Sequence, residues 1–221
     1  MTNFIFDIDG TLIDSNDLHA KAWEMAFRAI GLNVPFAKIR AQIGKGSDQL
    51  LPEFLGKEEI ERQGKKISGM SGEIFKREYL GLVRPFPKVR ELFNAIREKG
   101  GRIALASSGK EDEVEQYKII AQISDLVESS TSSDDAQKSK SQPDIFHAAM
   151  RQLSNPPAQS VLVVGDSPYD AIAAKRAHLT PGGVLCGGFA LATLNAAGCR
   201  TVYKDPADLL VNLESLFKRA Y

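Results

Sequence analysis

Short, continuous apolar runs recur along the chain and predict buried strands. The clearest are "NFIF" at 3–6, "RIALAS" at 102–107 and "SVLVVGD" at 160–166. A strand with one face in water alternates apolar and polar residues, whereas a continuous run is typical of a parallel strand covered on both faces. Two shorter candidates follow, "GGVLCGG" at 182–188 and "TVY" at 201–203. We therefore predict a sheet that contains these strands.

Helical patterns separate most of the strand candidates. They lie at 87–99, 143–153, 170–178 and 206–217. Strands that alternate with helices form parallel sheets with right-handed crossovers. The pattern predicts a doubly wound α/β fold, in which the stretch "ESSTSSDDAQKSKSQ" at 128–142 is interpreted as a polar loop.

The segment from residue 15 to residue 83 breaks this rhythm. It shows helical spacing, as at Leu18, Ala22 and Ala26, without strong strand candidates, and it returns through the proline-containing stretch "GLVRPFPKV". We predict a helical cap at 15–83, inserted into an α/β core made of 1–14 and 84–221. An insertion directly after the first strand lies over the edge where open α/β sheets bind ligands, so the cap is expected to act as a lid.

Composition excludes several classes of protein. The 221 residues are 43% hydrophobic, and 28 basic side chains balance 28 acidic ones, so net charge gives no attraction to nucleic acid or to an anionic membrane. Neither a signal peptide nor an apolar run of about 18 residues is found, and the two cysteines lack zinc-site spacing. We expect a cytoplasmic protein without a nucleic-acid or membrane partner, whose oligomeric state the sequence does not reveal.

Aspartates follow two of the predicted strands. Asp7 and Asp9 stand two residues apart after the first strand, so their side chains share a face. Asp166 ends another strand, and Asp170 follows one helical turn later. Close carboxylates repel unless a cation lies between them or one of them holds a proton. Hard oxygen ligands without nearby Cys or His favour Mg²⁺ over zinc, so this pattern predicts a metal site, a catalytic site, or both.

Four motifs occur in a fixed order along the chain. They are "DIDGTLIDS", Ser107 at the end of the second strand, Lys140 in "KSQPDIF", and "GDSPYD". In this order they resemble the haloacid dehalogenase-like superfamily of phosphohydrolases over nearly the whole chain. The insertion is similar to the helical cap of the phosphoglycolate phosphatase and β-phosphoglucomutase type. Ser141 departs from the pattern, because the family usually has proline after the lysine.

The resemblance implies a role for each motif. Asp7 would attack phosphorus to form an aspartyl phosphate, and Asp9 would act as general acid and base. Mg²⁺ would be held by the Asp7 side chain, the Asp9 backbone carbonyl and Asp166, with Asp170 as a ligand directly or through water. The phosphoryl oxygens would be bound by Ser107, Lys140 and backbone N–H groups around Ser108 and Gly109. The implied activity is that of a Mg²⁺-dependent phosphatase acting on a small phosphorylated metabolite.

Some of these residues have simpler interpretations. A single aspartate at a strand end is usually a turn or helix-capping residue, and only the ordered motifs outweigh this. A histidine such as His19 is more often structural, although the family places one there to position the acid/base aspartate. Lys45, in the glycine-flanked "IGKGSDQL", could reach a substrate anion or could be an exposed turn lysine.

Other functions stay open at the level of sequence. A phosphosugar mutase would use the same aspartyl phosphate and return it to a sugar hydroxyl, which His19 and the cap type permit. A non-catalytic phospho-ligand binding module on the same fold is a second alternative, for which the Ser141 departure leaves room. Dehalogenation is disfavoured, because the dehalogenases of the family lack the second aspartate, which is Asp9 here.

Overall fold

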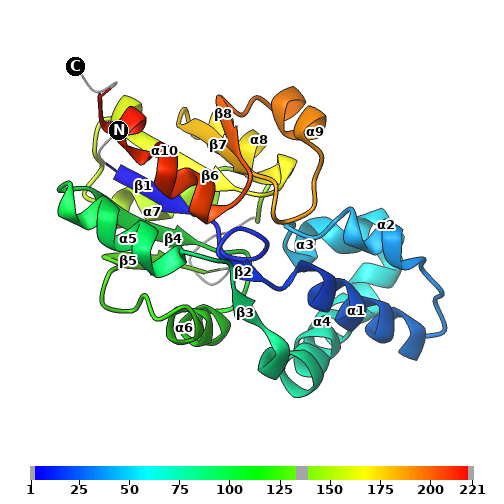
Figure 1. The fold of residues 1–221 in the computed structure, drawn as a ribbon. Coiled ribbons are helices and arrows are strands. Elements are labelled where there is room, and N and C mark those ends of the chain that lie inside the picture. Colours follow the sequence, from blue (N-terminus) through cyan, green and yellow to red (C-terminus); the bar gives the residue numbers. More distant parts are fainter. Residues whose placement is uncertain (1–2, 133–138, 219–221) are drawn as a thin grey trace.

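A six-stranded parallel sheet forms the centre of the computed structural model, which describes residues 3–132 and 139–218 (Figure 1). The predicted doubly wound α/β fold is confirmed. Chain order starts at β1 in the middle, moves outward through β4 to β5, and then crosses to β6 on the other side of β1. Ligands bind at such a switch point in open α/β sheets. In spatial order the strands are β5 (Ser129–Thr131), β4 (Arg102–Ala106), β1 (Asn3–Phe6), β6 (Val161–Gly165), β7 (Thr180–Val184) and β8 (Thr201–Tyr203).

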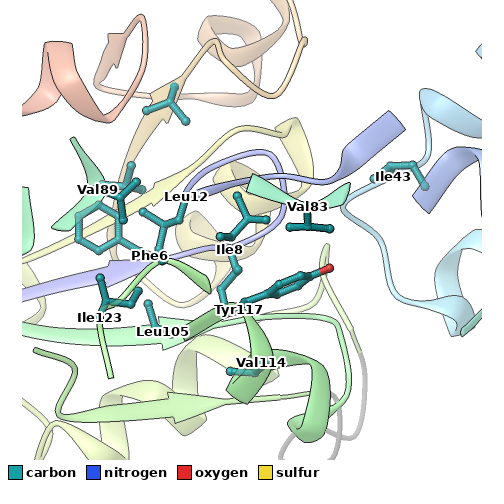
Figure 2. Close-up of a cluster of buried hydrophobic side chains, with 14 of the residues drawn as sticks. Phe6, Ile8, Leu12, Ile43, Val83, Val89, Leu105, Val114, Tyr117 and Ile123 are labelled. Carbon is teal, nitrogen blue, oxygen red and sulfur yellow. The ribbon is translucent and has the colours of Figure 1, made fainter. Parts of the chain in front are cut away.

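Helices cover both faces of the sheet because successive side chains of each strand point to opposite sides. Phe4 and Phe6 lie in one hydrophobic cluster with residues of α5 (Val89–Glu98), α6 (Glu111–Ile120) and α10 (Pro206–Lys218). Figure 2 shows part of this cluster, including Phe6, Leu105, Val114 and Tyr117. Ile5 belongs to the opposite cluster, with residues of α7 (Asp144–Gln152) and α8 (Pro168–Arg176). The shorter elements on the way to β6 and β8 are η5 (Ala158–Ser160) and α9 (Leu191–Ala197).

The chain between β1 and α5 is helical apart from a short two-stranded ribbon. In this ribbon β2 (Ile13–Asp14) pairs antiparallel with β3 (Arg84–Pro85), so the proline-containing return segment is paired with the outgoing chain. The helices between the two strands lie to one side of the sheet (Figure 1). They are α1 (Asn16–Ala29), α2 (Phe36–Arg40), α3 (Ser47–Leu50), η1 (Leu51–Glu53), α4 (Lys57–Ile74), η2 (Phe75–Tyr79) and η3 (Leu80–Leu82).

One strand lies where the sequence predicted a polar loop. Residues 129–131 form β5, which pairs with β4, and the Thr131 hydroxyl donates to the Leu105 carbonyl at 3.1 Å. The polar pattern concealed this strand because an edge strand is held mainly by backbone hydrogen bonds and needs no apolar run. Residues 133–138 of that stretch lie outside the described residues. The strand predicted at 182–188 is instead β7 at 180–184, and α6 and α9 were not predicted.

None of the described helices is long and apolar enough to cross a membrane, in agreement with the hydropathy of the sequence.

Candidate active site

The chain turns sharply where β1 ends, and this turn brings both aspartates to the carboxyl edge of the sheet. Asp7 still belongs to the ladder, because its N–H donates to the Val164 carbonyl at 2.9 Å. Gly10 then adopts a φ of +74°, and a Cβ there would lie 2.0 Å from Asn16 Nδ2 and 2.5 Å from Asp166 Oδ2. Only glycine fits this position. The tight turn therefore allows the first loop to approach the end of β6.

Three buried carboxylates meet at this edge. Asp7, Asp166 and Asp170 each offer an oxygen, and these oxygens lie within 4.8 Å of one another. Asp170 is fixed at the start of α8 by a capping box with Ser167, whose hydroxyl donates to Asp170 Oδ2 at 2.6 Å. Asp166 Oδ2 accepts from Asn16 Nδ2 at 2.8 Å. The sequence-predicted acidic residues from two distant motifs are thus brought together.

Lys140 is the positive charge that the structure places against this cluster. Its side chain is 1% exposed, and its ammonium forms ion pairs with Asp7 Oδ1 and, at 2.9 Å, with Asp170 Oδ1. Burial would lower the pKa of Lys140, but the charges of Asp170 and Asp7 hold it above its usual value. The structure therefore places Lys140 beside two of the predicted aspartates, and Ser141 does not displace it from the carboxylates.

One ammonium does not balance three buried carboxylates. Burial raises the pKa of Asp7 to about 7, against the opposing effect of Lys140, and burial together with the charge of Asp7 raises the pKa of Asp166 well above its usual value. Among the described residues, nothing donates a hydrogen bond to Asp166 Oδ1, and the amide oxygen of Asn16 is buried without a donor. Unpartnered hard oxygens at a site with excess negative charge are suited to a divalent cation.

Asp9 lies in a second polar cluster, beside the first. The Ser15 hydroxyl donates to Asp9 Oδ1 at 2.5 Å, and His19 Nε2 lies 3.0 Å from the same oxygen. Burial would raise the pKa of Asp9, but His19 and Ser15 hold it below its usual value. Burial would lower the pKa of His19, but Asp9 and Glu113 raise it. Each member of the pair therefore favours the charged form of the other.

The serine motif lies at the end of β4, next to β1. Ser107 is buried, and its hydroxyl accepts a hydrogen bond from the Gly109 N–H at 3.0 Å. Ser108 and Gly109 line a cavity of about 560 Å³, together with Asp7 and Asp9. Residues that follow Ser107 in the second motif therefore line the same cavity as the two aspartates of the first.

Lys45 lines the same cavity but is not part of the carboxylate cluster. Its ammonium pairs with Glu53 at 2.8 Å and lies 4.8 Å from the centre of the Tyr169 ring. Part of the cavity lining belongs to α4, where small side chains leave room. They are Ser68, Gly69, Ser71 and Gly72.

The helical insertion contacts the sheet side of the cavity through the loop that carries Lys45. The Tyr169 hydroxyl donates to the Ala41 carbonyl at 2.6 Å, and Ser139 Oγ accepts from the Gly46 N–H at 3.0 Å. Ser139 directly precedes Lys140 in the chain. The cavity is thus bounded on one side by the insertion and on the other by the carboxylate edge of the sheet.

Comparison with known proteins agrees with this geometry. Residues 1–178 match a family model described as haloacid dehalogenase-like hydrolase. The chain belongs to this family. Phosphoglycolate phosphatase of Nitrosospira multiformis is 30% identical over 179 residues, which cover 78% of this chain and 78% of that protein. Pyrophosphatase PpaX of Oceanobacillus iheyensis is 26% identical over 175 residues, 79% of each chain. A solved structure described as a hydrolase from Pseudomonas syringae has a TM-score of 0.89 and 29% identity, and covers 97% of this chain and 99% of that one.

Several residues of the site in this haloacid dehalogenase-like hydrolase were missed by sequence reasoning. Ser15 ends the first motif and Asn16 directly follows it, and this position in the chain was the available signal. Glu113 and Tyr117 lie on α6 and contact His19. They were not found because α6 itself was not predicted.

Proposed function

We propose that this hydrolase is a Mg²⁺-dependent phosphatase that acts on a small phosphorylated metabolite with Asp7 as nucleophile. The observation that carries the proposal is the position of Asp7. Its buried carboxylate lines the cavity, pairs with Lys140 and lies within 4.8 Å of the Asp166 and Asp170 oxygens, next to Asp9. The relatives named phosphoglycolate phosphatase and pyrophosphatase support the same class of reaction.

The carboxylates of Asp7, Asp166 and Asp170 would hold the metal ion, with the Asp9 backbone carbonyl as a further ligand. The donor set fits, because it consists of hard oxygens and leaves Asp166 Oδ1 without a partner among the described residues. When bound, Mg²⁺ offsets the repulsion between the nucleophile and the phosphate dianion.

The proposed reaction has two displacements at phosphorus. An Asp7 oxygen attacks, the bond from phosphorus to the leaving oxygen breaks, and Asp9 transfers to that oxygen the proton that it shares with His19. Water then attacks the aspartyl phosphate and gives its proton to Asp9, which releases inorganic phosphate and restores the Asp7 carboxylate. Ser15 and His19 both contact Asp9 Oδ1, which is therefore the oxygen that shares this proton and would pass it on. Lys140 and Ser107 would bind the phosphoryl oxygens.

The substrate would be enclosed between the edge of the sheet and the segment 15–83, which we propose to be the cap. Hydroxyl and glycine positions on α4 favour a small polar leaving group. Phosphoglycolate and pyrophosphate, which the names of the relatives suggest, are the first candidates to test.

Phosphate release from a panel of monoesters and pyrophosphate, with Mg²⁺ or with EDTA, tests this function. We expect release only with Mg²⁺. Product analysis with β-glucose 1-phosphate and a bisphosphate primer separates the alternatives, since glucose 6-phosphate with little free phosphate would indicate a mutase. Binding of phosphate esters with neither release nor isomerisation would indicate a binding module and would contradict the proposal.

The stability of the protein should depend on pH in opposite ways with and without metal. The folded-state pKa of Asp7 is about 7, above its ordinary value of 3.8, so the folded state binds this proton more tightly than the unfolded state. This tighter proton binding stabilises the folded state fully below about pH 4, and the stabilisation is lost as pH rises through about 7. Mg²⁺ binds the ionised carboxylates, so its stabilisation grows over the same range.

Thermal melting in EDTA and in Mg²⁺, between about pH 5 and about pH 8, measures this difference. We expect the gap between the two melting temperatures to widen as pH rises. A gap that is constant or that narrows would contradict the assignment of Asp7 to the metal site.

A further inference from the structure

Two residues of α6, outside the four motifs, contact the His19 and Asp9 pair. Tyr117 Oη lies 2.9 Å from His19 Nε2, and the same hydroxyl hydrogen-bonds to the Asp9 carboxylate. Glu113 Oε1 lies 3.9 Å from His19 Nε2. Glu113 and Tyr117 are four residues apart and so share one face of the helix, and both are buried.

The His19 ring is also held from the side of the insertion. Phe75 of η2 stacks on it, with ring centroids 3.8 Å apart and planes inclined by 4°. Tyr117 meets Phe75 edge-on at 6.5 Å. A ring confined on its face by Phe75 and at Nε2 by α6 has little freedom to rotate, and Nε2 is the atom that contacts Asp9.

Packing alone does not explain the polar atoms of these two residues. Figure 2 shows the Tyr117 ring within the hydrophobic cluster and its hydroxyl directed away from Leu105. Phenylalanine would fill the same space in the cluster without this hydroxyl. Burial of the Glu113 carboxyl group is costly unless it has a polar partner, and His19 Nε2 lies 3.9 Å from Glu113 Oε1.

We propose that Tyr117 and Glu113 are positioning residues that hold His19, and through it the Asp9 carboxylate, in the orientation that protonates the leaving oxygen. The inference rests on the proposed phosphatase mechanism. In this role, Tyr117 and Glu113 of α6 contact His19 of α1 at the acid/base group, although the two helices lie far apart in the chain.

A change in leaving-group dependence tests this role. Proton donation matters for an alkyl phosphate, whose alkoxide is a poor leaving group, and matters little for p-nitrophenyl phosphate, whose phenolate leaves without a proton. For Tyr117→Phe we expect kcat/KM to fall about tenfold for the alkyl substrate and to change less than about twofold for p-nitrophenyl phosphate. Glu113→Gln should show the same selectivity. The parameter kcat/KM reports the first displacement, so the later hydrolysis of the aspartyl phosphate does not obscure the comparison.

Tyr203→Phe is the matched control, because Tyr203 is also a buried tyrosine but lies on β8. Tyr203→Phe should leave kcat/KM unchanged for both the alkyl phosphate and p-nitrophenyl phosphate. Equal losses on both esters in Tyr117→Phe, or no loss on either, would overturn the positioning role. Wild-type levels of release from Asp7→Asn would instead overturn the phosphatase mechanism itself, so the two failures are distinguishable.

Discussion

Asp7→Asn is expected to abolish phosphate release and to leave the fold intact. The amide has nearly the shape of the carboxylate but cannot attack phosphorus, so turnover should fall by at least about 10³-fold. The carboxylate also repels the buried Asp166, and this repulsion contributes to the raised pKa of Asp166. The neutral amide removes the repulsion, so the melting temperature in EDTA should not fall at neutral pH.

Phosphate release and thermal melting, measured on the same preparation, check both expectations. Asp14→Asn is the matched control, because Asp14 is exposed on β2 at the far end of the same loop, and it should behave as wild type. Acid quenching during turnover should trap an acyl phosphate that hydroxylamine releases in wild type and not in Asp7→Asn. Release from Asp7→Asn at wild-type rates would exclude Asp7 as the nucleophile.

Much of the site could be predicted from the sequence because its residues follow buried strands. Asp7 follows the apolar run "NFIF" and Asp166 ends "SVLVVGD", and neighbouring parallel strands end at one edge, so their meeting follows from the fold class. Lys140 has no such local signal, because it lies in a polar stretch where lysines are usually solvated. Lys140 was identified only from its place in the motif "KSQPDIF". Its burial against Asp7 depends on contacts between residues far apart in the sequence.

The parts that the sequence did not reveal depend on partners far away in the chain. Strand β5 is recognisable only beside β4, which supplies its hydrogen bonds. Helix α6 mixes acidic and apolar residues without a strong stripe, so its pattern resembled that of a loop. Tyr117 and Glu113 can be recognised as site residues only in the folded structure, where α6 packs against His19, which is 98 residues away from Tyr117 in the sequence.

Lys140→Met should cost both activity and stability, and metal should restore part of the stability. The variant keeps a long side chain but removes the cation from Asp7 and Asp170, and breaking a buried pair in this way typically costs about 3–5 kcal/mol. Loss of an electrostatic contact to the transferring phosphoryl group should lower kcat by about 10²–10³-fold. Mg²⁺ supplies positive charge to the same carboxylates, so it should stabilise the variant more than wild type.

The pH dependence of this loss separates a charge effect from a packing effect. Lys140 lowers the pKa of Asp7, so in Lys140→Met the folded-state pKa rises further above about 7. A raised folded-state pKa means that stability is lost as pH rises, so the variant should be most destabilised at about pH 8 and least at about pH 5. Lys21→Met, on the exposed side of α1, is the control and should match wild type throughout. If Lys140→Met were equally destabilised at both pH values, the lysine would act through packing, and its role as counter-ion to the carboxylates would have to be abandoned.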